Sequence, residues 1–546
     1  MAKAVQHENP RRSGRWKKAV RAVLFAVLTA CLVALLSSLL TPSFRTDARY
    51  TVLGMYEQKT NTVQVAAFGA STMRRAFSPD YLFETYGLSA YGCCTSSQPP
   101  IASYYLLQDL LKSQGESLSV VLLDASSIVN TSSFFTSSVG AERVAACMPL
   151  SLTKIQYIWE MSNEYEDIEF IEQLIPVLKY HTRWSELGED DYVEFPVDRD
   201  QAKLHGQAIF SSMFWSNVSR GKSGAYTDEI NRTITESVDF SEEELRACWN
   251  DSSVKYMEKT IELCRQKGIN VLLVMIPRQD WGDLQHDSVA LFAQERGLEF
   301  ADMALPSVLA SCNLSYDTDY SDEKHPNLLG SYKLSDYLGR YLEEHFDFSD
   351  TRDGATSISD DDLDFFSQLD EDARLWTCVS LEEYLDRIDR DRYTVLISVK
   401  GEAADGLSAQ VRVKLEAMGL RKLSELTKNE SYVGVLDGGR LLAEKSDIKG
   451  ATVTVDGAYS HGTALVKGMS MQPGAKLNDP LHLLSQGKDI GGKSEIIVDG
   501  SNKSENGRGI NFVIYSKETG CMLDTASFDT HLGSQRTSDL VQQSSE

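Results

Sequence analysis

The chain has 546 residues, of which 42% are hydrophobic and 24% are charged, and its formal net charge is −25. This length and apolar content indicate a globular protein with two or three domains, each large enough to bury a core. The negative charge argues against nucleic acid as a partner, because an acidic surface repels a phosphate backbone.

The first predicted element is a membrane helix over residues 22–40. These residues carry no charge, and as a helix they would span about 28 Å, which matches the hydrocarbon core of a bilayer. Residues 1–21 carry a net charge of +6. By the positive-inside rule we therefore expect a cytoplasmic basic tail, a single-pass anchor in the cell membrane and an extracellular remainder.

A cleaved signal peptide is the competing interpretation of the same segment. Residues 28–31, LTAC, are similar to a bacterial lipoprotein processing site. The run stays uncharged for nine residues beyond Cys31, which favours an anchor that is not cleaved.

The exported part carries a charge of −31 once the +6 tail is taken from the total of −25. Eight cysteines lie outside the membrane segment, and only Cys93 and Cys94 are adjacent. Neighbours in sequence seldom form a disulfide, and the other spacings are not those of metal sites. The sequence therefore predicts no metal and no cofactor, and it leaves disulfides open.

Residues 60–345 alternate apolar runs with amphipathic stretches. The runs that look like buried strands are residues 63–68, 118–124, 269–277 and, more weakly, 298–303. Helix-like segments such as ASYYLLQDLLKSQG and SVKYMEKTIELCRQKG lie between them. This alternation predicts a parallel sheet with helices on both faces, a three-layer α/β/α domain, with reactive groups at the carboxyl ends of its strands.

Ser71 stands at such a strand end, in the sequence Gly69-Ala70-Ser71. Small residues are common at strand-to-helix turns, so a nucleophilic role for Ser71 requires a base elsewhere in the chain. Asp322 precedes His325 by three residues, after the last strand and before a helix-like run. A carboxylate beside a histidine fixes its tautomer and stabilises the imidazolium, so these two residues are the predicted base.

The Gly-Ala-Ser and Asp-x-x-His segments resemble the first and last blocks of the SGNH (GDSL-like) hydrolases, over roughly residues 60–345. The closest resemblance is to membrane-anchored bacterial members, akin to the proteins of teichoic-acid D-alanylation and alginate O-acetylation. The resemblance implies a flavodoxin-like parallel sheet and an acyl-transfer site with Ser71, Asp322 and His325 as catalytic residues.

The same resemblance implies oxyanion donors, and here the sequence departs from the family. The backbone amides of Ser71 and Gly92 are the expected donors, although an alternative alignment puts Cys94 at the position of Gly92. The third block, Gly-x-Asn-Asp, is replaced by Asp124-Ala125-Ser126. One expected donor is therefore missing, which favours a weak or inactive site unless another group replaces it.

Residues 181–184, HTRW, are a second candidate site. An arginine beside an aromatic residue can clamp a sugar or a carboxylate, or can pin a long insert against the core. His181, Arg183 and Trp184 are therefore candidate substrate-binding residues, with the pinning role slightly favoured.

The composition changes after residue 345. Residues 347–364 are acidic and carry few bulky side chains. They predict a solvated linker over residues 346–365, between domains that fold separately. A second domain is predicted over residues 366–532 and a polar tail over residues 533–546. The second domain begins helix-like and continues with short strands and Gly-Asp turns, which indicates a β-rich module.

Within this module, residues 434–439, 491–500 and 506–530 resemble the interleukin-like (ILEI, GG-type) domain. That α+β domain is also found in the stem of a protein O-mannose N-acetylglucosaminyltransferase, and its members are associated with glycan binding or with signalling. Arg508, Asn511 and Asp529 are candidates for contacts with a sugar. Asn and Asp beside turns more often form hydrogen bonds with their own backbone, so a structural role is favoured over contact with a sugar.

Two functions follow from these features. The first is a membrane-anchored extracellular serine esterase or O-acyltransferase acting on acyl esters of cell-surface polysaccharide or other glycan, with an accessory glycan- or protein-binding domain. A transferase would add a membrane acyl-donor protein as a partner. The alternative is a catalytically weak or inactive scaffold that serves as a surface carbohydrate-binding protein.

Overall fold

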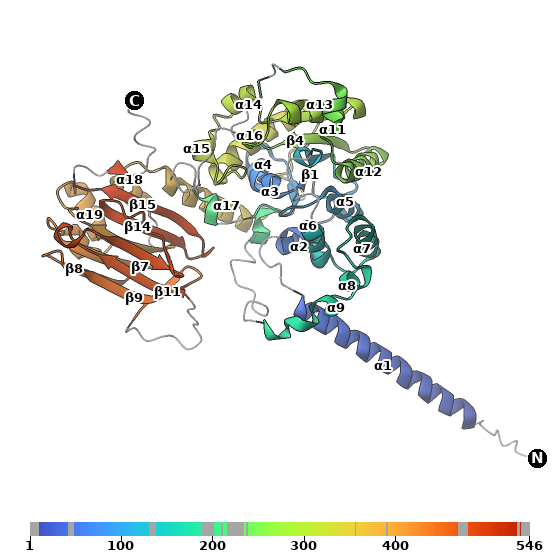
Figure 1. Cartoon of the computed structure of the whole chain (residues 1–546), viewed down its shortest axis with the longest axis horizontal. Helices are drawn as coiled ribbons and strands as arrows, with labels where there is room; N and C mark the ends of the chain where they lie inside the picture. The colour runs from blue at the N-terminus through green and yellow to red at the C-terminus, as the bar shows by residue number, and fades with distance from the viewer. Residues whose placement is uncertain are drawn as a thin grey trace, which may run out of the picture.

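The structure is a computed structural model that describes residues 10–41, 48–129, 138–187, 201–208, 211–215, 234–235, 238–354, 356–388, 391–467, 479–531 and 535–536. Figure 1 shows a long N-terminal helix, an α/β region and a β-rich region in chain order. The N-terminal helix is α1 (Pro10–Leu40). Within the described residues it is the one helix with the length and composition to cross a membrane, a property that anchors and signal sequences share.

The α/β region is built on a parallel sheet of five strands in the order β2-β1-β3-β4-β5. The strands are β1 (Val65–Gly69), β2 (Ala90–Cys94), β3 (Val120–Asp124), β4 (Asn270–Met275) and β5 (Glu299–Asp302). This order is that of flavodoxin-like doubly wound sheets. The expected fold class is confirmed, and β2 is a strand that the sequence did not predict.

Helices cover both faces of this sheet, because the side chains of each strand alternate between two apolar cores. Ala66 and Phe68 pack into the first core, whereas Val65 and Ala67 pack into the second. Helices of the first face are α2 (Ala48–Glu57), α5 (Pro100–Gln114), α6 (Ser138–Cys147), α7 (Leu152–Glu164), α12 (Asp251–Lys267) and α13 (Asp283–Arg296). Helices of the second are α3 (Ser71–Ala76), α4 (Pro79–Tyr86), α14 (Pro306–Ser311) and α16 (Leu328–His345).

Shorter helices connect or flank these elements. They are η1 (Ala125–Ser127), α8 (Phe170–Leu174), α9 (Val177–Tyr180), η3 (His181–Ser185), η5 (Gln201–Leu204), η6 (Ser211–Met213), α11 (Glu242–Ala247) and α15 (Tyr316–Asp319).

The β-rich region contains two antiparallel sheets that enclose an apolar core. The first has the order β16-β15-β14-β6-β7-β8, with β6 (Tyr393–Lys400), β7 (Ser431–Asp437), β8 (Arg440–Asp447), β14 (Gly509–Ser516), β15 (Met522–Asp529) and β16 (Gln535–Arg536). The second has the order β10-β9-β11-β12-β13, with β9 (Val453–Ser460), β10 (Thr463–Val466), β11 (Asp479–Ser485), β12 (Ser494–Val498) and β13 (Ser501–Asn502). The associated helices are α17 (Asp360–Ala373), η7 (Arg374–Thr377), α18 (Leu381–Arg387), α19 (Ala409–Ala417), α20 (Arg421–Ser424) and η8 (Lys488–Ile490).

The segment predicted as a solvated linker is attached to the α/β region, which corrects that expectation. Thr351 donates its amide hydrogen to the carbonyl of Gly87 (2.9 Å), and Ser357 accepts the amide hydrogen of Lys59 (2.9 Å). Helix α17 then begins at Asp360, capped by the side chain of Ser359, and buries Phe365. Asp360, Asp361 and Asp364 face solvent on an amphipathic helix, so the acidic composition concealed an ordered element.

The two regions also share one apolar core. Leu328 and Tyr332 of α16 belong to the same cluster of buried side chains as Phe366 of α17 and Val395 of β6. Because this core crosses the predicted boundary, the two regions pack directly against each other and are not separated by a solvated linker.

The predicted polar tail contains a buried residue. Arg536, in strand β16, is 4% exposed and donates two hydrogen bonds to Asp524, at 2.9 and 2.7 Å. It also donates to the carbonyl oxygens of Leu375 and Trp376. Residues 533–534 and 537–546 of this tail lie outside the described residues.

Candidate active site

Ser71 lies at the carboxyl end of the parallel sheet, as predicted. Strand β1 ends at Gly69, Ala70 is the N-cap residue of helix α3, and Ser71 is the first residue of that helix. The turn is tight, since a Cβ on Gly69 would lie 2.5 Å from the Cβ of Asp124 on the neighbouring strand. The glycine therefore permits the close approach that brings Ser71 out of the strand end.

Ser71, His325 and Asp322 form a continuous chain of hydrogen bonds. The Oγ of Ser71 lies 2.8 Å from Nε2 of His325, and Nδ1 of His325 lies 2.9 Å from both carboxylate oxygens of Asp322. A proton on Nδ1, held by the carboxylate, leaves Nε2 to accept the hydrogen of the Ser71 hydroxyl. The residues are 254 positions apart in the chain, and the fold brings them into the arrangement of a nucleophile with its base.

The loop that carries the base is held by its own backbone. Tyr320 and Pro326 form an antiparallel bridge, and the amide of Ser321 donates to the carbonyl of His325 (2.9 Å). Asp322 also accepts the amide hydrogen of His325 (2.9 Å). Burial raises the pKa of Asp322, but its hydrogen bonds with His325 outweigh that effect and lower the pKa to about 2. The carboxylate is therefore ionised at neutral pH.

Arg75 connects the helix of the nucleophile to the loop of the base. Its Nη1 donates to the hydroxyl of Ser321 (2.7 Å), which in turn donates to the carbonyl of His325 (3.1 Å). Arg75 follows Ser71 by four residues, so both lie on one face of α3. Arg75 was not among the residues predicted from the sequence, although its position one turn after the nucleophile was a usable signal.

Gly92 does not have the predicted role. It lies within strand β2, and its amide donates to the carbonyl of His205 at 2.8 Å. An amide hydrogen that is already bonded to a carbonyl cannot also stabilise an oxyanion. Cys94, the alternative residue, is buried at the end of β2, and its thiol lies 3.4 Å from the carbonyl of Ala67.

The segment Asp124-Ala125-Ser126, which replaces the third block, places a hydrogen-bond acceptor beside the turn that carries Ser71. Asp124 Oδ2 accepts the amide hydrogen of Ala70 (3.2 Å), and Oδ1 accepts the hydroxyl hydrogen of Ser126 (2.6 Å). Thr95 follows β2 at the same edge, and its fully buried hydroxyl has no hydrogen-bond partner within the described part of the chain. Since Gly69 pairs with Cys94, Thr95 is level with Ala70 in the sheet.

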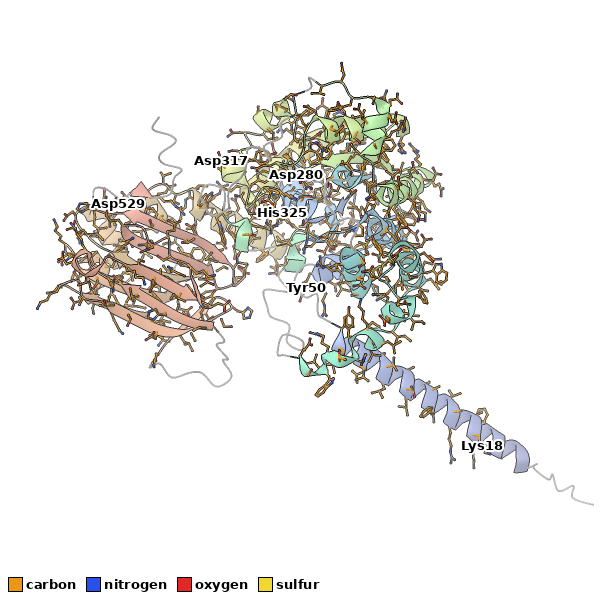
Figure 2. All side chains as sticks on the ribbon, in the orientation of Figure 1. Lys18, Tyr50, Asp280, Asp317, His325 and Asp529 are labelled. Atoms are coloured by element: carbon orange, nitrogen blue, oxygen red, sulfur yellow. The ribbon has the colours of Figure 1, made fainter. Side chains whose placement is uncertain are left out.

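A further polar group, which the sequence analysis did not assign, lies after strand β4. Arg278 donates to Asp280 Oδ2 (2.6 Å), and Asp280 also contacts Lys324 Nζ at 3.4 Å, beside His325. In Figure 2, the labels of Asp280 and His325 mark this neighbourhood, and Asp529 lies in the β-rich region. The charged sequence PRQDW directly after a buried strand was the available signal. No group of three or more potential metal ligands occurs among the residues that the structure describes.

The HTRW residues lie beside the end of α1. His181 Nδ1 contacts the carbonyl of Leu178 at 2.9 Å, and Arg183 donates to the carbonyl of Leu40 at 3.1 Å. Trp184 is 72% exposed. These contacts fit the pinning role.

The candidates in the β-rich region have structural partners. Asn511 is fully buried and both accepts from and donates to the backbone of Gly507, each at 2.9 Å, so its role as a sugar ligand is wrong. Arg508 forms an ion pair with Asp529 at the surface. This pair remains accessible to solvent.

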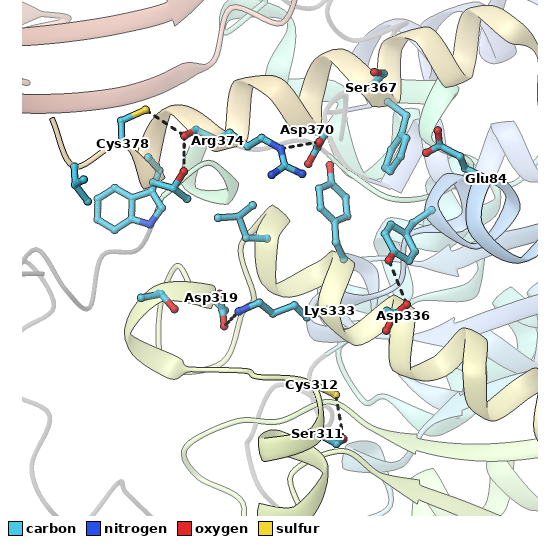
Figure 3. A pocket seen from close by; sticks show the side chains of 18 of the residues that line it. Glu84, Ser311, Cys312, Asp319, Lys333, Asp336, Ser367, Asp370, Arg374 and Cys378 are labelled. Carbon is cyan, nitrogen blue, oxygen red and sulfur yellow. Dashed lines mark hydrogen bonds and ion pairs between the residues drawn. The ribbon is translucent and has the colours of Figure 1, made fainter. Parts of the chain in front are cut away.

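A pocket of about 800 Å³ lies between the two regions (Figure 3). Its walls come from α4, α14, α15 and α16 on one side and from α17, η7 and Arg536 on the other. Its basic side chains are each paired with a carboxylate, in the pairs Lys333–Asp319, Arg340–Asp336, Arg374–Asp370 and Arg536–Asp524. The pocket is therefore nearly neutral and contains both aromatic and hydroxyl groups.

Comparisons with known proteins describe both regions. Residues 349–439 match the model of the Interleukin-like EMT inducer family, so the chain carries a domain of that family in its C-terminal part. A GDSL-like lipase of Bacteroides thetaiotaomicron is similar in structure, with 12% identity, a TM-score of 0.21, and coverage of 52% of this chain and 88% of that one. A protein assigned as an acylhydrolase in Bacteroides fragilis has 12% identity and a TM-score of 0.24, and the match covers 56% of this chain and 99% of that one. No curated protein matches the chain.

Proposed function

We propose that this protein is a bacterial serine esterase or O-acyltransferase, anchored by α1 with its bulk outside the cell, that acts on acyl esters of cell-surface glycan. The observation that carries the proposal is the chain of hydrogen bonds from Ser71 through His325 to Asp322. Its position at the carboxyl edge of a parallel sheet is where such folds expose reactive groups.

In the proposed reaction, Ser71 Oγ attacks the acyl carbonyl while its proton passes to Nε2 of His325. Asp322 stabilises the imidazolium that forms, and the oxyanion faces the amide of Ser71 at the start of α3. Collapse of the intermediate releases the alcohol, which takes the proton back from His325 and leaves an acyl ester on Ser71. Water or a sugar hydroxyl then attacks that ester while His325 accepts its proton, and collapse of the second intermediate breaks the bond to Ser71 Oγ, which takes the proton back from His325.

The hydroxyl of Thr95 is our candidate for the second oxyanion donor, in place of Gly92. It is unpaired within the described residues, lies at the same edge of the sheet as the nucleophile turn, and is fully buried, so this role requires that substrate binding opens that edge. Replacing Thr95 with Val should lower kcat by about 10²-fold and leave KM for a small ester unchanged, whereas Thr95→Ser should retain most activity. Equal kcat in wild type and Thr95→Val would remove Thr95 from the mechanism.

The decisive experiment is covalent labelling of the full chain in detergent with a fluorophosphonate probe, together with hydrolysis of p-nitrophenyl acetate. Ser71→Ala should abolish both the label and the hydrolysis. Ser162→Ala, a control on the exposed surface of α7, should change neither. Labelling that survives in Ser71→Ala would place the nucleophile elsewhere.

The pocket of Figure 3 is where we place the accessory glycan-binding role. A neutral pocket with aromatic walls suits an uncharged polyol, because apolar sugar faces pack on rings and hydroxyls bond to the paired ions. Ser367→Trp, on the pocket-facing side of α17, should raise KM for acetylated xylo-oligosaccharides without changing p-nitrophenyl acetate hydrolysis. Asp364→Trp is the matched control on the same helix, and an equal KM effect of both variants would reject this placement.

One observation favours the alternative function of a carbohydrate-binding scaffold without catalysis. Asp124 presents a carboxylate at the nucleophile turn where the third block would present a donor. If the wild-type chain is not labelled and still binds glycan, the scaffold is the correct description.

A further inference from the structure

Four large apolar side chains are exposed close to the extracellular end that we assign to α1. They are Trp159 (58% exposed), Ile171 (52%), Leu178 (46%) and Trp184 (72%), and together they are called the juxtamembrane patch. Three of them lie within residues 171–184, and large exposed apolar side chains that gather on one segment indicate a contact surface.

The segment that carries the patch is fixed directly to α1. Val177 donates its amide hydrogen to Ser37 Oγ (3.2 Å), and Arg183 donates to the carbonyl of Leu40 (3.1 Å). Figure 1 shows α8 and α9 beside the end of this helix. Leu174, Ile175 and Pro176 also line an apolar groove of about 570 Å³ with the side of α1 from Phe25 to Ser37.

These contacts set the level of the patch relative to a bilayer. If α1 spans the membrane, Ser37 and Leu40 lie at the outer end of the span, and the segment bonded to them lies at the same depth. Trp159 reaches this segment through an edge-to-face contact with Phe170, with ring centroids 5.6 Å apart. Tryptophan is enriched at that depth because its ring is apolar and its N–H can bond to headgroups.

We propose that residues 170–185 and Trp159 form a second membrane-contacting element, seated in the interfacial layer of the outer leaflet beside α1. The occupant of the patch is lipid, because residues 174–176, between Ile171 and Leu178, line an apolar groove whose other wall is the membrane helix itself. The element holds the α/β region at a fixed height over the bilayer, which one flexible tether would not do. This inference rests on the proposed anchoring by α1.

The test uses the full chain in phosphatidylcholine–phosphatidylglycerol vesicles that contain lipids brominated near the headgroup, which quench nearby tryptophan fluorescence. Trp16 of α1 reports anchoring, and we expect Trp16→Phe to lower the quenched fraction. In the Trp16→Phe background, Trp184→Phe should lower the quenched fraction again. Trp376→Phe, which removes a ring 3% exposed in the β-rich region, should not.

A charged variant provides a second measurement. Leu178→Asp should reduce quenching of Trp184 while the chain still floats with the vesicles, because α1 is intact. If the chain floats with the vesicles but Trp184 is not quenched, the proposal is overturned and the anchoring by α1 stands. A protein that covers the patch in place of lipid would give this result. A chain that does not float, with Trp16 unquenched, would overturn the anchoring and the proposal together.

Discussion

Arg75 and Ser321 are joined by a hydrogen bond of 2.7 Å, which connects the helix of the candidate nucleophile to the loop of the candidate base. Both the hydroxyl and the backbone amide of Ser321 donate hydrogen bonds to the carbonyl oxygen of His325. A movement of Arg75 would therefore change the separation of Ser71 and His325, although Arg75 is not in the proton path.

We expect Arg75→Met to lower kcat by about 10- to 100-fold with little change in KM, because misplacement of reacting groups by about 1 Å has that scale of effect. Fluorophosphonate labelling should slow in parallel, since it depends on the same nucleophile. Arg75→Lys, which keeps a donor, should recover part of the rate. A Met variant with wild-type kcat would show that the loop is positioned without this bond.

Replacement of Asp322 with Asn should lower kcat by about 10⁴-fold, because the amide no longer holds the histidine tautomer or the imidazolium. The pKa of Asp322 is lowered to about 2, so its contribution to stability is present at neutral pH and is lost only as the pH falls toward that value. The comparison is made at pH 7, where the wild-type carboxylate is ionised. Wild-type kcat in Asp322→Asn at this pH would contradict the assignment.

The buried pair of His205 and Asp80 predicts a dependence of stability on alkaline pH. Burial lowers the pKa of His205, but Asp80 at 2.9 Å and Asp362 raise it by more, so the pKa lies above its ordinary value. The stabilisation from charged His205 is complete below about pH 6.5 and is lost as the pH rises through the raised value. The thermal midpoint of the wild type should therefore fall between pH 6 and pH 9.

The variant His205→Gln tests whether His205 causes this dependence of stability on pH. The variant should be less stable by about 3 to 5 kcal/mol at pH 6, because a buried carboxylate loses its partner. Its residual dependence on alkaline pH should be smaller than that of the wild type. His482→Gln, which removes an exposed contact with Asp456, is the matched control and should retain the wild-type dependence.

The position of helix α17 predicts which C-terminal fragment of the chain can fold by itself. A fragment of residues 366–546 lacks the N-cap Ser359 and the buried Phe365, losses of roughly 1 and 3 kcal/mol. A fragment of residues 349–546 keeps both. Calorimetry should show a cooperative transition for the longer fragment and a broad or absent one for the shorter. Equal transitions would show that α17 adds nothing to the C-terminal core.

The strands and motifs that follow from a local residue pattern could be predicted from the sequence. Four of the five parallel strands are the apolar runs, and Ser71, Asp322 and His325 were found because each lies in a short motif. Strand β2 was missed because AYGCC has a glycine and two cysteines in place of a β-branched run. Helix α17 was missed although Ser359 precedes Asp362 by three residues, a capping signal that the acidic composition concealed.

The errors at the site have a different cause, because they depend on contacts between distant residues. The partner of the Gly92 amide is His205, which no motif connects to it. Asn511 was chosen for its polar side chain, and the turn at Gly507 uses both of its polar atoms. Such pairings follow from the tertiary fold, and a single sequence does not encode them in its spacing.

The bond between Gly92 and His205 also protects the molecule from self-association. Strand β2 is the outermost strand of its sheet, and an open strand with free amides invites pairing with another chain. The neighbouring Gly206 has a φ of +98°, and a Cβ there would lie 2.0 Å from the carbonyl oxygen of Gly92. Any larger residue at position 206 would push the covering segment away, so its first consequence should be aggregation of the folded protein through an uncovered strand.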